Sequence, residues 1–214
     1  MALRVAILDF DGTLVESVGI KDRAFERLYG DTPQWPAISE YHLANNHTIR
    51  FEKFRVIDER FLGIEHTPER AADLAARFSA LVADEIVASP EVPGARELLD
   101  ALDAADVRTY LLSMSPADEL GDILARRGLG ERFAGVYAHP WAKADAVCDI
   151  LTRESAAPAD AVMVGDSPED ATAARTCGVR FVGRDSGKEL PIGSDVHADL
   201  LGVLGALFPD EAML

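Results

Sequence analysis

Cysteine, lysine and long apolar runs are scarce in this chain of 214 residues. The two cysteines, Cys148 and Cys177, have no metal-ligand spacing and no redox motif around them, so we expect buried free thiols, not a disulfide or a zinc site. No apolar run approaches the roughly 18–20 residues that a membrane span needs, and a predicted strand begins at once with no signal-peptide pattern. These features predict a cytoplasmic protein.

Positive charge is also in short supply. The 21 lysines and arginines face 37 aspartates and glutamates, which gives a net charge of −16. This charge repels nucleic-acid phosphates and anionic lipid headgroups, so neither nucleic acid nor a membrane surface is an expected partner. An anionic protein still binds a small phosphate where a few cationic groups and a metal are concentrated. The positions of the four lysines are therefore informative: Lys21, Lys53, Lys143 and Lys188.

From Ala95 onward, amphipathic segments alternate with apolar runs. Predicted helices cover Ala95–Ala105, Pro116–Arg127, Ala144–Glu154 and Ala171–Thr176, and predicted strands cover Val107–Leu112, Gly135–Ala138, Ala161–Gly165 and Val179–Val182. A further strand is expected at Leu3–Leu8, and Asp195–Phe208 is expected to be a closing amphipathic helix. This order predicts an α/β fold, a Rossmann-like parallel sheet with helices on both faces.

The alternation is missing between the first strand and Ala95, where the pattern favours helices only. They are expected at Ile20–Tyr29, Ile49–Phe61 and Pro68–Val87. Pro90, Pro93 and Gly94 then mark the return to the alternating pattern. The sequence therefore predicts a core domain of residues 1–15 and 88–214, interrupted by an all-helical cap domain of residues 16–87.

The segment from Leu8 to Thr13, Leu-Asp-Phe-Asp-Gly-Thr, places two carboxylates at the end of the first predicted strand. Gly12 permits the chain to turn there, and the carboxyl ends of parallel strands are where open α/β sheets bind ligands. The like charges of Asp9 and Asp11 require a cation or a shared proton, and a divalent metal is the simplest solution. The alternative is that one aspartate caps a helix and the other is solvated.

Three further polar groups follow predicted strands. Ser113 and the backbone N–H groups from Met114 onward suit an anion, or the serine is a plain helix cap. Lys143 begins a helix, where the dipole disfavours a cation, so a bound phosphate would explain it; a solvated lysine is the alternative. Asp166 and Asp170 add oxygen ligands of the kind that Mg²⁺ prefers, although Asp166 also suits a helix cap.

The order of these motifs, Asp-x-Asp-Gly-Thr, serine, lysine and Gly-Asp-Ser-x-x-Asp, resembles the haloacid dehalogenase superfamily in its phosphatase branch, with a type-1 helical cap. Dehalogenases of that superfamily lack the second aspartate, so Asp11 favours chemistry at phosphorus. The resemblance implies that Asp9 is the nucleophile that forms an aspartyl-phosphate and that Asp11 is the general acid and base. It also implies Mg²⁺ binding by Asp9, Asp11, Asp166 and Asp170, and phosphate binding by Gly12, Thr13, Ser113, Met114 and Lys143, of which Ser113 and Lys143 would also take part in catalysis.

The polar part of the insert is expected to select the substrate. Asn46, His47, Arg50 and Lys53 are candidates to face the site, and a solvated helix face is the alternative. A capped site favours a small soluble phosphate monoester, such as a sugar phosphate or a phosphorylated acid. We therefore predict a Mg²⁺-dependent phosphatase. A phosphomutase similar to β-phosphoglucomutase, or a catalytically silent binding protein on the same scaffold, is the alternative; the sequence leaves open whether the chain is a monomer or a homodimer.

Overall fold

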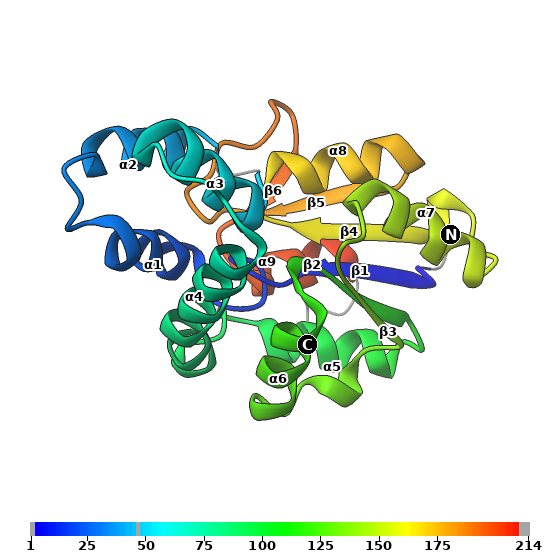
Figure 1. Cartoon of the computed structure of the whole chain (residues 1–214). Helices are drawn as coiled ribbons and strands as arrows, with labels where there is room; N and C mark the ends of the chain where they lie inside the picture. The colour runs from blue at the N-terminus through cyan, green and yellow to red at the C-terminus, as the bar shows by residue number, and fades with distance from the viewer. Residues whose placement is uncertain (1–2, 46–47, 210–214) are drawn as a thin grey trace. The chain divides into compact units, whose positions relative to one another are not determined.

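The computed structural model describes residues 3–45 and 48–209 and contains one parallel sheet within these ranges (Figure 1). Within these ranges the sheet has six strands in the order β3-β2-β1-β4-β5-β6, each pair parallel. The strands are β1 (Val5–Asp9), β2 (Arg108–Pro116), β3 (Gly135–His139), β4 (Ala161–Gly165), β5 (Arg180–Arg184) and β6 (Asp195–His197). The strand order reverses between the neighbours β1 and β4, and such a switch point opens a crevice at the carboxyl ends of the strands.

Helices cover both faces of this sheet, as the sequence predicts. The helices α7 (Lys143–Arg153) and α8 (Pro168–Cys177) lie on one face, and α5 (Ala95–Ala104) and α6 (Ala117–Arg126) lie on the other (Figure 1). On the first face, Val5 and Ile7 of β1 and Met163 of β4 pack in one buried cluster with apolar residues of α7 and α8. Every residue of β1 and β4 is buried because the sheet is covered on both sides, which explains their continuous apolar sequence.

The chain forms two compact units. One takes the chain up to Glu16 and from Ser89 onward and contains the sheet, and the other spans Ser17–Ala88. The second unit is helical, with α1 (Val18–Tyr29), α2 (Trp35–Ala44), α3 (Arg50–Val56), a π-helical turn (Ile57–Leu62) and α4 (Pro68–Ala88). Its core is aromatic, because the rings of Phe25, Phe54 and Phe78, which are all buried, contact one another.

Three elements differ from the sequence prediction. Helix α2 (Trp35–Ala44) is not among the helices that the sequence predicts. Strand β2 continues to Pro116, beyond the expected end at Leu112, and its register with β3 shifts in between. The segment 195–208 is not one helix: the short edge strand β6 comes first, and the Asp199 carboxylate then accepts the Gly202 N–H (2.9 Å) at the start of α9 (Leu200–Leu207). This N-cap starts α9 after Asp199.

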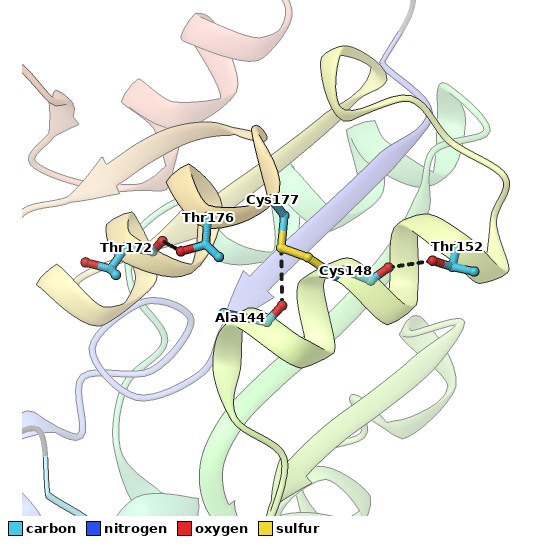
Figure 2. Close-up of a disulfide and its surroundings, with 6 residues drawn as sticks. All are labelled: Ala144, Cys148, Thr152, Thr172, Thr176 and Cys177. Atoms are coloured by element: carbon cyan, nitrogen blue, oxygen red, sulfur yellow. Dashed lines mark hydrogen bonds between the residues drawn. A yellow bond between two sulfur atoms is a disulfide. The ribbon is translucent and has the colours of Figure 1, made fainter.

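The prediction of two buried free thiols is wrong. Cys148 on α7 and Cys177 at the end of α8 form a disulfide with a Cα–Cα distance of 5.7 Å (Figure 2). Cys148 is exposed and Cys177 is half-buried. The cysteines are 29 residues apart in the sequence and meet only because the two helices lie side by side, so no local spacing reveals the pair. None of the described helices is long and apolar enough to cross a membrane.

Candidate active site

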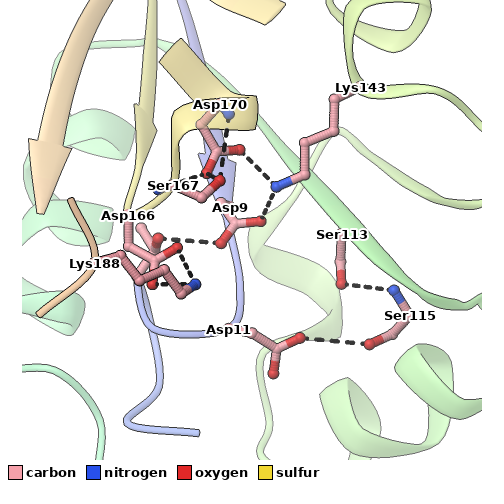
Figure 3. A network of polar contacts seen from close by, with 10 residues as sticks. Asp9, Asp11, Ser113, Ser115, Lys143, Asp166, Ser167, Asp170 and Lys188 are labelled. Atoms are coloured by element: carbon pink, nitrogen blue, oxygen red, sulfur yellow. Dashed lines mark hydrogen bonds and ion pairs between the residues drawn. The ribbon is translucent and has the colours of Figure 1, made fainter. Parts of the chain in front are cut away.

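Three buried carboxylates meet where β1 and β4 end (Figure 3). Asp9 is the last residue of β1, Asp166 directly follows β4, and Asp170 lies in the first turn of α8. One oxygen from each lies within 4.8 Å of the others. The strand order of the sheet thus brings Asp9 next to Asp166 and Asp170, which follow it by more than 150 positions. Buried carboxylates this close in space require positive charge.

Lys143 supplies part of this charge from the first residue of α7. Its Nζ lies 2.7 Å from Asp9 Oδ1 and 2.6 Å from Asp170 Oδ1 (Figure 3). Burial by itself lowers the pKa of a lysine, but Asp170 and Asp9 together raise the pKa of Lys143 above its ordinary value. The ion pairs with the two carboxylates offset the unfavourable position of a cation at a helix N-terminus.

Asp9 is held on both sides. Thr13 Oγ1 donates a hydrogen bond to its Oδ2 (3.2 Å), opposite the contact with Lys143. Burial raises the pKa of Asp9 to about 6, and Lys143 opposes this rise. A buried carboxylate that is oriented by a hydroxyl and an ammonium is a suitable nucleophile.

Asp170 has protein partners on both of its oxygens. Oδ1 accepts from Lys143, and Oδ2 accepts from the hydroxyl (2.6 Å) and the backbone N–H (3.2 Å) of Ser167. The Asp170 N–H in turn donates to Ser167 Oγ (3.3 Å), so the two residues form a capping box at the start of α8. The capping box fixes Asp170, and Asp170 fixes Lys143.

Asp166 binds a lysine that the sequence motifs do not include. Lys188, in the segment after β5, places its Nζ 2.7 Å from Asp166 Oδ2 and 3.0 Å from Oδ1 (Figure 3). Burial raises the pKa of Asp166, and the Lys188 ammonium opposes this. Lys188 follows the last motif by many positions, so no motif identifies it as a site residue. The scarcity of lysine in the chain is the only sequence signal for it.

Asp11 is not part of the group of three carboxylates and lies apart from them in Figure 3. Ser115 Oγ donates to Asp11 Oδ2 (3.4 Å), and the Ser115 N–H donates to the buried Ser113 Oγ (3.1 Å) (Figure 3). The φ of Gly12 is +79°, a value that favours glycine. The side chain of Met114, between the two serines, is exposed. The two serines lie in β2 where its register shifts, so the structure shows Ser113 in a strand and not at the start of a helix.

Arg184 is a second residue that the motifs do not reveal. Its side chain is buried at the end of β5, its Nη1 donates to the Gly12 carbonyl (3.0 Å), and its Nη2 forms an ion pair with Glu16. Arg184 stands 172 residues after Gly12 in the sequence. Its contact with the Gly12 carbonyl therefore fixes the turn beside Asp11.

The candidates in the helical unit have contacts within that unit. Arg50 stacks on the ring of Phe78 (4.9 Å to the centroid) and donates to Ser79 Oγ (3.2 Å). Lys53 is 3% exposed, and its Nζ lies 3.1 Å from Nδ1 and 3.2 Å from the carbonyl oxygen of His42. Burial lowers the pKa of Lys53 to about 8. These contacts place Lys53 in the packing of the helical unit, and substrate contacts of Arg50 and of Lys53 both stay predictions. Asn46 and His47 lie outside the described residues.

A model of the haloacid dehalogenase-like hydrolases matches residues 3–178. The chain belongs to this family. The haloacid dehalogenase-like chain is 29% identical to the phosphoglycolate phosphatase of Pseudomonas putida over 219 residues, which cover 96% of this chain and 79% of that protein. It is also 29% identical to the phosphoglycolate phosphatase of Synechococcus elongatus over 179 residues, 83% of this chain and 81% of that protein.

Solved structures of the family share the fold. CbbY from Rhodobacter sphaeroides, in its complex with phosphate, superimposes with a TM-score of 0.70 at 20% identity, covering 91% of this chain and 92% of that chain. The family match and the two phosphatase relatives make this haloacid dehalogenase-like chain an enzyme, a hydrolase of phosphoric monoesters.

Proposed function

We propose that this enzyme is a Mg²⁺-dependent phosphatase that hydrolyses a small soluble phosphate monoester through an aspartyl-phosphate intermediate. The observation that carries the proposal is the position of Lys143. Its Nζ lies 2.7 Å from Asp9 and 2.6 Å from Asp170, two of the three buried carboxylates that meet at this site. A strand-end carboxylate with an ammonium fixed beside it is what attack on a phosphoryl group requires, because the ammonium neutralises charge on the transferring oxygens.

In the first step an oxygen of Asp9 attacks phosphorus, and the bond between phosphorus and the ester oxygen breaks. Asp11 gives its proton to the departing oxygen, so the alcohol leaves neutral. In the second step Asp11 takes a proton from water, which attacks phosphorus and releases phosphate and the free Asp9 carboxylate. The hydrogen bond from Ser115 to Asp11 (3.4 Å) would orient the acid and base, and the Ser113 hydroxyl and Lys143 would bind the transferring oxygens.

The carboxylates of this site suit a magnesium ion. Asp9 and Asp166 are buried, close together and offer only oxygen atoms, the ligands that Mg²⁺ prefers. Asp170 belongs to the same group of carboxylates and stays a predicted ligand, and it also holds Lys143 beside Asp9. When bound, the ion would supply positive charge for the phosphoryl oxygens. The participation of Asp11 in metal binding, through its backbone carbonyl, stays a prediction from the family resemblance.

The substrate that we propose is a phosphorylated small acid, with phosphoglycolate as the first candidate. The support is that both curated relatives, at 29% identity, are phosphoglycolate phosphatases. We also propose that the helical unit Ser17–Ala88 is the cap of the enzyme, because it is inserted between the first motif and the rest of the core. The cytoplasmic location stays a prediction, and the redox state of Cys148 and Cys177 in the cell would test it, since disulfides are rare in the cytosol.

Release of inorganic phosphate tests this function. Phosphoglycolate, sugar phosphates and nucleotides are incubated with the wild type and with Asp9→Asn, in Mg²⁺ and in EDTA. We expect release only from the wild type in Mg²⁺, with phosphoglycolate the best substrate. Asp122→Asn, an exposed aspartate on α6, is the matched control and keeps full activity.

Full turnover by Asp9→Asn would disprove the mechanism. No release from any ester, together with transfer of phosphate between positions of a sugar phosphate, would show a phosphomutase. No reaction of either kind would show a silent scaffold.

A further inference from the structure

Lys188 differs from Lys143 in how its ammonium is held. Both hydrogen bonds that it forms within the described residues go to one carboxylate, that of Asp166, at 2.7 and 3.0 Å. The Asp166 side chain is 1% exposed, whereas the Lys188 side chain is 32% exposed. The lysine therefore reaches a buried carboxylate from the protein surface.

The segment that carries Lys188 is free of regular structure. Residues 185–194, between β5 and β6, form neither helix nor strand, and the φ of the neighbouring Gly187 is +87°. Lys143, by contrast, is the first residue of a helix and contacts two carboxylates, one of which is fixed by a capping box. Of the two ammonium groups at the site, that of Lys188 moves at the lower cost.

The Lys188 ammonium also occupies the oxygens that a metal would use. Asp166 belongs with Asp9 and Asp170 to the group of carboxylates that could hold a divalent ion, and both oxygens of Asp166 contact Lys188. An ammonium and a divalent cation on the same buried carboxylate repel each other. A metal at Asp166 therefore competes with the observed ion pair to Lys188.

We propose that Lys188 is an exchangeable counter-ion: it neutralises Asp166 in the metal-free enzyme, and the divalent cation displaces it from that carboxylate. The inference rests on the metal site of the proposed function. It has two consequences. The metal-free site stays folded with its carboxylates in place, and the affinity for the metal is lower than the same carboxylates would give without a competing ammonium.

Direct measurement of metal binding tests the exchange. Isothermal titration calorimetry with Mg²⁺ compares the wild type with Lys188→Met, and thermal melts follow both with and without Mg²⁺. We expect Lys188→Met to bind Mg²⁺ about tenfold more tightly or better, since the competing charge is gone. The metal-free variant should melt at a lower temperature than the wild type, and Mg²⁺ should raise its melting temperature by a larger amount.

Two further variants separate the exchange from other effects. Arg175→Met removes one positive charge from the exposed side of α8, and its Mg²⁺ affinity should equal that of the wild type. Lys188→Arg keeps a cation in reach of Asp166, and it should restore the weaker, wild-type affinity.

A labelling experiment on the wild type needs no variant that must fold. Amine acylation followed by mass spectrometry measures the reactivity of Lys188 relative to Lys21, which lies in the helical unit. Mg²⁺ should increase acylation of Lys188 and leave that of Lys21 unchanged. Equal acylation with and without Mg²⁺, or an affinity for Mg²⁺ that is unchanged or weaker in Lys188→Met, overturns the exchange alone. Absence of Mg²⁺ binding in the wild type overturns the metal site and the exchange with it.

Discussion

Lys143 Nζ lies 2.6 Å from Asp170 Oδ1, a contact that joins the first residue of α7 to the first turn of α8. Asp170 is itself fixed by Ser167, so the lysine beside Asp9 is positioned by two protein elements at once. This arrangement makes the ammonium rigid, and rigid charges stabilise a transition state without reorganisation.

Lys143→Met is therefore expected to lower kcat by about a hundredfold or more. The variant also leaves the buried carboxylates of Asp9 and Asp170 without their cation, which should reduce the free energy of unfolding by about 3 kcal/mol. Phosphate release and urea denaturation measure the two effects. Arg175→Met, on the exposed side of α8, serves as the control and should change neither. A Lys143→Met enzyme with wild-type kcat would show that the ammonium takes no part in the reaction.

The raised pKa of Asp9 predicts how the stability of the metal-free protein depends on pH. Asp9 has a pKa of about 6 in the folded chain against 3.8 for an ordinary aspartate carboxyl. The folded state therefore binds the proton more strongly. This contribution to stability is complete below pH 3.8 and is lost as the pH rises through about 6.

Urea denaturation in EDTA, at several pH values between about 4 and 7, checks this sign. The free energy of unfolding of the wild type should fall over that range more steeply than that of Asp9→Asn, which cannot titrate at this position. Burial and the neighbouring Asp9 charge also raise the pKa of Asp166. Asp9→Asn removes that charge, so the difference between the two curves reports Asp9 together with its coupling to Asp166. Parallel curves would show that Asp9 has an ordinary pKa.

Much of the site is predictable from sequence because its motifs follow strands. Asp9, Lys143, Asp166 and Asp170 each stand near the carboxyl end of a strand or at the start of the next helix, and a parallel sheet gathers those ends at one edge. The periodicity of the segments is enough to predict the sheet and the helices on both its faces.

The remaining features depend on tertiary contacts that leave no local pattern. Lys188 reaches Asp166 from an irregular segment, and Arg184 binds the Gly12 carbonyl from the end of β5. The disulfide between Cys148 and Cys177 requires that α7 and α8 be neighbours, which only the folded sheet determines. Strand β6 has three residues, too few for an alternating pattern to be visible.

Reduction of this disulfide should destabilise the protein. The cysteines close a loop with a sequence separation of 29, and the loss of unfolded-chain entropy from such a loop stabilises the folded state by about 3–4 kcal/mol. Urea denaturation with and without dithiothreitol measures the difference. Cys148→Ser should match the reduced wild type and be insensitive to dithiothreitol. If reduction leaves the midpoint of the wild type unchanged while thiol titration confirms that the bond is open, the disulfide contributes no stability.

Gly165, the last residue of β4, has no room for a side chain. A Cβ at this position would lie 2.4 Å from Asp170 Cγ and 2.6 Å from its Oδ2. Gly165→Ala must therefore push Asp170 away from Ser167 or from Lys143. We expect kcat to fall at least about tenfold and the free energy of unfolding to fall by about 1–3 kcal/mol.

Gly121→Ala is the matched control for this substitution. Gly121 lies within α6, and a Cβ there meets no atom within 4 Å. The same change of one methyl group should then raise stability by roughly 0.5–1 kcal/mol, because alanine favours a helix over glycine, and should leave kcat unaltered. Opposite signs of the two stability changes would locate the cost at Asp170, whereas a Gly165→Ala enzyme with normal kcat would mean that Lys143 keeps its position without Asp170.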